Sequence, residues 1–484
     1  MGMLPSYDYL YFKQGNEENA GYYSVDRTRQ REVSFFGTGT YSYKGRYTLN
    51  GTVRYEGSNK LGKSRKARWL PTWNVSAAWN AHEEEFWQSF RDVVSNMTLK
   101  ASYSLTADRG PASVSNSKAI INSYNTWRPF TSMKESGLIL SSVENSELTY
   151  EKKHELNIGA EIGFIDNRIN IEADWYTRNN FDLIGLIYTK GTGGQLAKFA
   201  NVASMKSSGV EFTVSTRNIK TKDFSWNTDF IFSHTKNEVT DLQSNASVMD
   251  MISGNGFAME GYPVRALFSM DFQGLNENGY PTFINEKGQL TVSDINFQEQ
   301  LKKDHLVYEG PTDPTMTGSL GNIFRYKGFT LNAFITYSFG NVIRLDPVFH
   351  NVYSDLDAMP REFINRWTAG GDEKVTNVPV IADKRANQQD PYLSYAYNAY
   401  NYSTERIAKG DFIRMKELSL SYNFPKKMIS RLKVNDLSLK IQATNLFLIY
   451  SDKKLNGQDP EFFNTGGVAS PVPRQFTLTL RLGI

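Results

Sequence analysis

One short segment has the spacing of a phosphate-binding loop. Gly57 to Ser64 reads GSNKLGKS and satisfies the pattern G-x-x-x-x-G-K-S, in which backbone amides cradle phosphates while Lys and Ser serve the terminal phosphate and magnesium. That chemistry requires a strand before the loop and a helix after it. Here the sequence RKARWLP follows, and Pro71 leads into an alternating strand. We therefore expect no helix after the loop and no nucleotide site.

Residues that could bind metal or catalyse a reaction show no useful spacing. The five histidines, at positions 82, 154, 234, 305 and 350, are far apart and lack paired-ligand spacing, and there is no cysteine. The cluster of Asn276, Asn278 and Gly279 lacks the acidic ligands and terminal Glu of a calcium loop, so it predicts a turn. No Ser/His/Asp constellation can be argued from spacing. We predict no metal site, no cofactor and no enzymatic activity.

Aromatic side chains in two expected loops are the better candidates for ligand contact. They are Tyr124, Trp127 and Phe130 in one loop, and Tyr395, Tyr397, Tyr400 and Tyr402 in the other. Such rings could stack on sugar faces or contact a protein partner through their apolar bodies and hydroxyls. The alternative is that they pack loop against loop.

Composition excludes two classes of protein and favours strands. The hydrophobic fraction is 40% of 484 residues, and no stretch approaches the roughly 18 uninterrupted apolar residues of a membrane helix. The net charge of +3 includes no basic run, so nucleic-acid binding has no electrostatic footprint. Abundant Tyr and Phe together with Ser, Thr, Asn and Gly favour strands and long polar loops.

Period-two alternation predicts thirteen strands. In residues 155–164, five apolar side chains alternate with Glu155, Asn157 and Glu161. After an Asp166-Asn167 turn, residues 168–175 alternate in the same way, which predicts an antiparallel hairpin. Eleven further strands are expected at 33–43, 46–55, 72–80, 97–105, 208–217, 224–236, 315–326, 329–339, 411–424, 435–448 and 474–484.

Two folds fit these strands, a soluble β-sandwich or repeat protein and a transmembrane β-barrel. Several strands alternate for about ten residues, which is the length that a tilted strand needs to cross a bilayer. Charged residues in the middle of the polar faces suit a water-filled lumen, so we predict an all-β, antiparallel transmembrane barrel. The predicted lumen-facing residues are Arg54, Glu155, Glu161, Arg168, Glu172 and Asp174, and the predicted interface girdles include Trp79, Trp175, Trp226 and Tyr337.

Connection lengths predict which end of each strand faces the cell exterior. Short turns are expected at 44–45, 166–167, 218–223, 327–328 and 425–434, and long extracellular loops near 106–153, 179–207, 237–314 and 340–410. The strand-like segment 263–273 is placed within a loop to preserve this asymmetry. We expect residues 1–32 to be an extracellular loop segment and 33–484 to be barrel. Thirteen strands cannot close as an even-stranded barrel, so the missing strands are expected from a preceding segment or a second polypeptide.

Landmark segments along nearly the whole chain resemble the SusC/RagA family of TonB-dependent outer-membrane transporters. They occur in family order and are YKGRYTLNGTVRYEGSN at 43–59, LPTWNVSAAWNAHEEEFW at 70–87, FANVASMKSSGVEF at 199–212, GDFIRMKELSLSYNFPKKM at 410–428, NLFLI at 445–449, QDPEF at 458–462 and PVPRQFTLTLRL at 471–482. The resemblance implies a barrel of about 22 strands in the bacterial outer membrane, with a plug in its lumen. It also implies a SusD-like surface lipoprotein as a hinged lid, and energy from the TonB complex.

The chain also departs from the family pattern. We expect the signal peptide, TonB box and plug of the family to lie in a separate, plug-bearing segment that couples this chain to TonB. Ala203 stands where the family has glycine, and the chain ends in Ile484 instead of an aromatic residue. The implied function is active import of oligosaccharides or oligopeptides, with outer-membrane lipid around the barrel. The alternative is a soluble or surface-displayed carbohydrate-binding β protein without transport activity.

Overall fold

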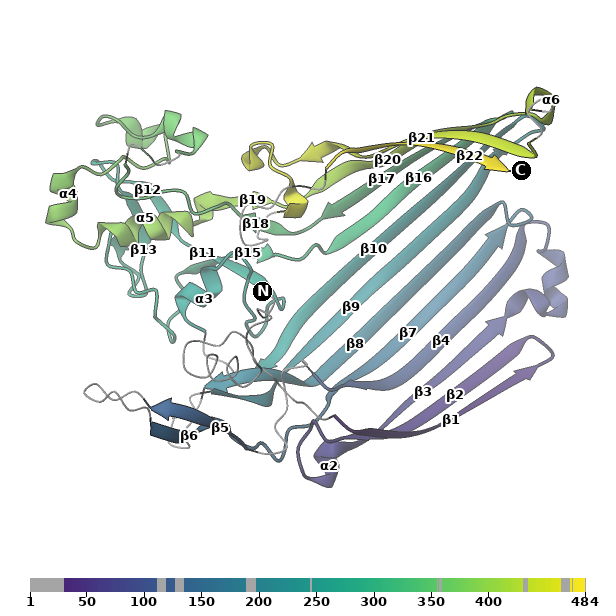
Figure 1. Ribbon diagram of the computed structural model, residues 1–484, viewed down its shortest axis with the longest axis horizontal. Helices are drawn as coiled ribbons and strands as arrows, with labels where there is room; N and C mark the ends of the chain where they lie inside the picture. The colour runs from purple at the N-terminus through teal and green to yellow at the C-terminus, as the bar shows by residue number, and fades with distance from the viewer. Residues whose placement is uncertain are drawn as a thin grey trace, which may run out of the picture.

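A computed structural model describes residues 30–110, 119–126, 135–188, 197–243, 246–354, 356, 359–429, 434–462, 471 and 473–483. Thirteen antiparallel strands form one sheet in chain order, each beside its predecessor, as Figure 1 shows. They are β1 (Glu32–Tyr43), β2 (Tyr47–Ser58), β3 (Trp69–Asn80), β4 (Val94–Asp108), β7 (Glu151–Phe164), β8 (Ile169–Tyr188), β9 (Ala197–Lys220), β10 (Phe224–Leu242), β16 (Met316–Tyr326), β17 (Phe329–Phe339), β20 (Phe412–Asn423), β21 (Asp436–Ser451) and β22 (Gln475–Gly483). The prediction of thirteen strands is confirmed.

The register gives the sheet one apolar and one polar face. Across β7, β8 and β9, Ala160 lies opposite Ala173, and Ala173 lies opposite Phe212. One position along, Glu161 lies opposite Glu172. Because successive side chains on a strand point to opposite faces, pairing in register extends each face across the whole sheet. We call these the apolar face and the polar face.

The predicted hairpin of β7 and β8 turns through backbone that few residues adopt. Ile165, Asp166 and Asn167 all have a positive φ, between 51° and 56°. Asp and Asn tolerate this left-handed conformation better than other non-glycine residues, which explains the pair at the centre of the turn. The Asp166-Asn167 hairpin is therefore confirmed.

The predicted long loop at 179–207 is wrong. β8 and β9 remain paired beyond this point, as far as Tyr188 opposite Ala197. The pairing passes a bulge at Asp182, whose φ is 57°. Asn201 secures the bulge, because its amide donates to the carbonyl of Asp182 (2.6 Å) and to that of Thr149 (3.0 Å) while its Oδ1 accepts from the Thr149 N–H (2.9 Å). The bulge interrupts the period-two pattern, so the alternation ended before the strands did.

The remaining long connections carry structure of their own at one end of the sheet (Figure 1). Residues 246–311 and 342–409 form a lobe, here called the loop lobe, with core residues such as Phe283, Phe349 and Phe363. Its segment 263–273 contains β11, which pairs with β15 outside the main sheet, as predicted. The lobe elements are α3 (Val248–Ile252), β11 (Ala266–Met270), β12 (Phe272–Leu275), β13 (Pro281–Ile284), β14 (Leu290–Thr291), β15 (Leu306–Pro311), β18 (Val342–Arg344), α4 (Lys384–Gln389), α5 (Leu393–Asn401) and β19 (Ile407–Lys409).

Smaller elements complete the connections. At the loop end lie α2 (Arg65–Arg68) and the hairpin of β5 (Ile120–Thr126) and β6 (Glu135–Ser142), and at the turn end lie α6 (Lys426–Ile429) and the 3-10 helices η1 (Ala81–Glu83) and η2 (Glu85–Ser89). Further 3-10 helices are η3 (Arg361–Asn365), η4 (Asp372–Lys374), η5 (Thr404–Arg406), η7 (Lys453–Leu455) and η8 (Pro460–Phe462). None of the helices in the described ranges is long and apolar enough to cross a membrane.

The two outer strands of the main sheet are β1 and β22, and over the described residues they do not pair with each other. On β22, Phe476, Leu478 and Leu480 lie on the apolar face and are strongly exposed. Ile484 lies outside the described residues, as do residues 1–29 of the expected loop segment 1–32.

Candidate functional site

The predicted lumen-facing residues share the polar face. Glu155 lies opposite Arg178, and Glu161 lies opposite Glu172. Asp174 lies opposite Gly159, and the missing Cβ leaves room for Asp174 Oδ1 in its present position, which lies 2.2 Å from where a Cβ would be. Their common face is a result of the structure, whereas a lumen on that side stays a prediction.

Arg54 and Arg168 lie near opposite ends of the polar face. Arg54 forms an ion pair of 2.6 Å with Glu56 near the loop end of β2. Arg168 lies in the turn before β8, where its Nε donates to the Arg217 carbonyl (2.8 Å) and its Nη2 to the Asn218 carbonyl. Arg168 therefore fastens adjacent turns, a structural role that alternation does not predict.

Ion pairs lie on the polar face, both within one strand and between neighbouring strands. Glu155 pairs with Lys153 at 2.7 Å and with Arg178 at 3.1 Å, and Lys100 pairs with Glu161. Arg178 also stacks 4.0 Å from the centroid of the Tyr176 ring. A face with alternating charges and amides can solvate a polar solute, and it would be costly against hydrocarbon.

The four residues predicted as girdles lie on the apolar face. Trp79 is opposite Leu99, Trp175 is opposite Val210, and Trp226 is opposite Phe324. Tyr337 lies near the loop end of β17, where its hydroxyl donates to the Ile231 carbonyl (2.8 Å). Trp79 and Trp226 lie near the turn ends of their strands, so the set includes positions toward both margins of the face.

The loop aromatics divide into buried and exposed rings. Tyr397 and Tyr400 are buried in the core of the loop lobe, where burial strongly raises the pKa of both phenols. These two rings pack loop against loop and offer no surface to a ligand in this structure, which corrects the prediction of direct contact. The segment forms the helix α5, which turns Tyr397 and Tyr400 toward the lobe core, whereas the period-two pattern predicts only a loop here.

Tyr395 remains a candidate, and the structure adds a neighbour. Its side chain is 43% exposed, and its ring lies 5.7 Å from the exposed ring of Tyr392, a residue that the sequence did not single out. Tyr402 instead lies beside a buried cation, with its ring 5.8 Å from the Arg344 guanidinium. Tyr124 lies in β5, and its side chain is outside the described residues, as are Trp127 and Phe130. The exposed pair of Tyr392 and Tyr395 presents two rings tilted by 56° to each other, and sugars and peptide side chains can contact such aromatic faces.

Arg344 is a buried arginine that connects several segments of the loop lobe. Its guanidinium donates to the carbonyls of Ser403 (2.8 Å) and Phe268 (2.6 Å), so it joins β18 to β11 and to the segment after α5. Burial lowers the pKa of Arg344 to about 9. Burial also raises the pKa of nearby Glu309, whose Oε1 has no hydrogen-bond partner. No periodic signal marks either residue, because their partners are far away in sequence.

Arg414 connects two of the landmark segments through ion pairs. It lies in β20 within GDFIRMKELSL, and it forms ion pairs with Asp459 and, at 2.8 Å, with Glu461 of QDPEF. The Arg414 and Asp459 side chains are only 6% and 12% exposed. The two motifs are therefore halves of one buried charge cluster that folds the connection from β21 onto β20.

In the phosphate-loop pattern and in the Asn276 cluster, the side-chain oxygens accept hydrogen bonds from nearby backbone N–H groups. Ser64 of the phosphate-loop pattern caps α2 by accepting from the Ala67 N–H (3.2 Å), so the prediction of no helix was wrong, although α2 is a single turn. In the expected turn, Asn276 Oδ1 accepts from the N–H groups of Asn278 (3.0 Å) and Tyr280 (2.9 Å). These oxygens already serve the chain itself.

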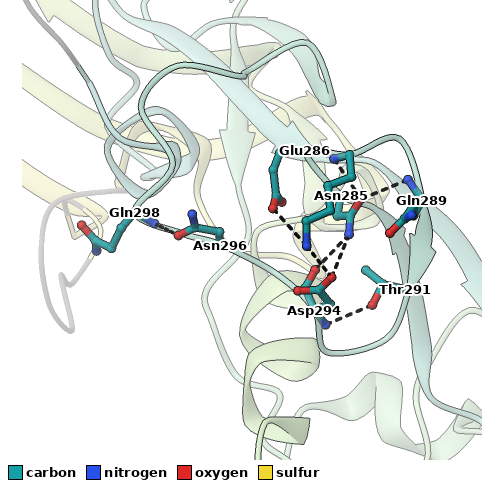
Figure 2. Close-up of polar contacts among 8 residues, drawn as sticks. Asn285, Glu286, Gln289, Thr291, Asp294, Asn296 and Gln298 are labelled. Carbon is teal, nitrogen blue, oxygen red and sulfur yellow. Dashed lines mark hydrogen bonds and ion pairs between the residues drawn. The ribbon is translucent and has the colours of Figure 1, made fainter.

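A similar turn joins β13 to β14, as Figure 2 shows. Asn285 Oδ1 accepts from the N–H groups of Lys287 and Gln289, each at 3.0 Å. Lys287 Nζ pairs with Asp294 (2.9 Å), whose N–H donates to Thr291 Oγ1 (3.0 Å). No group of three or more His, Cys, Asp or Glu side chains in the described part of the chain could hold a metal ion.

The loop lobe carries an open polar depression of about 590 Å³. Its lining includes Asn365, Arg366, Lys374, Asn377 and Glu405. Amides and charges of both signs can hydrogen-bond to hydroxyl or peptide groups, so the depression suits a polar oligomer and does not distinguish a glycan from a peptide.

Comparison with known proteins gives consistent matches. Residues 4–446 match the family described as TonB dependent receptor-like, beta-barrel. TonB-dependent receptor P3 of Formosa agariphila is 24% identical over 443 residues, covering 89% of this chain and 42% of the relative. TonB-dependent receptor SusC of Bacteroides thetaiotaomicron is 25% identical over 478 residues, covering 94% of this chain and 44% of the relative. The chain thus spans less than half the length of these relatives.

The fold matches a solved structure of the RagAB peptide transporter. The TM-score is 0.75 at 21% identity, with 94% of this chain and 48% of that chain covered. The family consists of outer-membrane receptors and transporters, not enzymes, so the predicted fold class and outer-membrane localisation are confirmed. The match along the chain and the shared fold together show that this protein belongs to the TonB-dependent receptor-like β-barrel family, and that it is of the SusC/RagA type.

Proposed function

We propose that the chain is the carboxy-terminal part of the barrel of a nutrient importer, and that its polar face lines a plugged lumen. The observation that carries this proposal is the unbroken division of a thirteen-stranded sheet into an apolar and a polar face. An open sheet with an exposed apolar face is stable in lipid only if its edges are paired, because unpaired backbone groups there cost several kcal/mol each. The edges β1 and β22 therefore need further strands.

The partners in this proposal follow from family membership and from the share of its relatives that the chain spans. A plug-bearing amino-terminal segment, in the same protein or a second chain, would pair with β1 and β22 and connect the barrel to the TonB complex. A SusD-like lipoprotein would cover the loop end, where the lobe presents Tyr392, Tyr395 and the polar depression. The cargo would be an oligosaccharide or an oligopeptide, because these groups can contact either.

Uptake by cells tests the proposal. The bacterium that carries this chain would be compared with a strain that lacks it, using fluorescently labelled oligosaccharide and oligopeptide mixtures. We expect uptake of one mixture to be lost with the chain and also with TonB, and the double variant Tyr392→Ala, Tyr395→Ala to reduce it. The matched control is Tyr326→Ala, which removes a half-exposed tyrosine at the turn end of the sheet, away from the exposed pair. Unchanged uptake without the chain would contradict import.

Detergent behaviour separates the rival function. A carbohydrate-binding β protein without a membrane sheet should purify as a single species in buffer alone. The importer should remain in the outer-membrane fraction until detergent is added, and the exposed apolar residues of β22 favour this result.

A further inference from the structure

The connection between β3 and β4, residues 81–93, differs from the tight turns at the same end of the sheet. It contains η1 and η2 and stands off the turn end of the strands in Figure 1. It includes the acidic run from Glu83 to Glu85. Its side-chain contacts attach it to the apolar face of the sheet.

Glu84 attaches the segment to the margin of the apolar face. Its carboxylate accepts from the Tyr47 hydroxyl, from Trp79 Nε1 (3.3 Å) and from Arg46 Nη1 (3.0 Å). Tyr47 and Trp79 lie directly opposite each other on β2 and β3, and both belong to the apolar face. The segment therefore continues that face beyond the turn end of the strands.

Large apolar side chains of this segment point away from the protein. Phe86 and Phe90 are each 56% exposed and flank the buried Trp87, whose ring centroid lies 6.2 Å from each of theirs. Trp87 is held in place because its Nε1 donates to the Val94 carbonyl (2.9 Å). Val93 and Ile165 are also more than half exposed, and the Ile165 N–H donates to the Val93 carbonyl (3.0 Å).

The same segment exposes acidic groups to water. The Glu85 side chain is 91% exposed and the Glu83 side chain 57%. A short segment that exposes both aromatic rings and carboxylates is suited to the boundary between hydrocarbon and water.

We propose that residues 81–93 form a lipid-contacting segment, in which Phe86 and Phe90 insert into the phospholipid leaflet at the turn end of the strands. The occupant is lipid because the rings continue the apolar face, which already faces lipid in an outer-membrane protein of this family. This inference rests on the barrel proposed above, and it adds an anchor outside the strands. The segment would set how deep the strands sit in the bilayer.

Site-directed spin labelling tests the proposal, since the chain contains no native cysteine. Labels at Phe86→Cys and Phe90→Cys would be compared with Glu85→Cys in the full-length protein, placed in vesicles of phosphatidylethanolamine and phosphatidylglycerol. We expect collision with oxygen to exceed collision with a water-soluble nickel chelate by several-fold at 86 and 90, and the reverse at 85. A difference in gel mobility between unheated and heated samples would confirm that each labelled protein is folded.

Two further labels separate this inference from the barrel itself. Ile171→Cys on the apolar face should show the oxygen preference, and Glu172→Cys should show the nickel preference. If 171 and 172 behave in this way while 86 and 90 resemble 85, the segment faces water and the inference is wrong. If 86 and 90 are shielded from both reagents, protein covers them and the inference is also wrong. A nickel preference at 171 would overturn the barrel proposal and this inference with it.

Discussion

An arginine at the centre of the apolar face should block assembly, whereas an arginine at the next residue should not. On β8 the apolar-face positions from the turn toward the loop end are Ile169, Ile171, Ala173, Trp175 and Thr177. With a rise of about 3.4 Å per residue and a tilt of about 40°, residues 169–177 span about 21 Å along the membrane normal, close to the roughly 25 Å of a barrel's apolar band. Ala173 therefore marks the centre, and Trp175 lies only about 5 Å from it, away from the margin predicted for a girdle residue. Ile171 lies about 5 Å nearer the turn.

The position of Ala173 sets the size of the effect. A charged arginine costs about 2 to 4 kcal/mol at the bilayer midplane and about 0 to 1 kcal/mol near an interface. At 1.4 kcal/mol per factor of ten, Ala173→Arg should lower the assembled fraction roughly 30- to 700-fold. Ile171→Arg should have an intermediate effect. Glu172→Arg should be tolerated, because this side chain lies on the polar face opposite Glu161.

The assay would measure the outer-membrane fraction and heat-resistant mobility of the full-length protein, followed by urea titration in vesicles. Ala173→Leu is the control for side-chain size, and it should assemble normally. We expect assembly to decrease from Glu172→Arg through Ile171→Arg to Ala173→Arg. Equal tolerance of Ala173→Arg and Glu172→Arg, or a greater loss at Glu172, would refute the assignment of the two faces.

Three further outcomes follow from the site. Arg414→Met should destabilise the protein by about 3 to 5 kcal/mol in urea titration, because it leaves Asp459 buried and unpaired. Adding Asp459→Leu should recover part of the lost stability, and no recovery would argue against a buried pair. Burial raises the pKa of Glu309, so its contribution to stability is complete below its unfolded pKa and is lost as pH rises through the folded pKa. Melting of Glu309→Gln should therefore depend less on pH above the ordinary pKa of a glutamate than melting of the wild type, and parallel curves would contradict this. Tyr397→Ala should destabilise the loop lobe by about 3 to 5 kcal/mol, measured by hydrogen exchange, because Tyr397 is buried. Tyr395→Ala should leave hydrogen exchange unchanged, and similar exchange in both variants would show that burial does not distinguish the two residues.

The sequence by itself determined the strands and their faces. Alternation in residues 155–164 and 168–175 was sufficient to predict a hairpin, its turn and the face of Glu161 and Glu172, because a strand's side chains must alternate and one face must be apolar. The parity of short and long connections also kept segment 263–273 out of the main sheet, as the structure has it. These properties depend on residues close together in the sequence, so they can be predicted without the tertiary contacts.

The tertiary structure alone decided where the strands end and which loop side chains are available. The bulge at Asp182 carries β8 and β9 past the end of the alternation, and it depends on Asn201 reaching Thr149 from a distant segment. Arg414 and Asp459, or Arg344 and Phe268, meet only when separate connections fold together. Burial of Tyr397 and exposure of Tyr395 likewise depend on which side of α5 faces the lobe core. Such contacts join residues far apart in sequence, and period-two patterns contain no information about them.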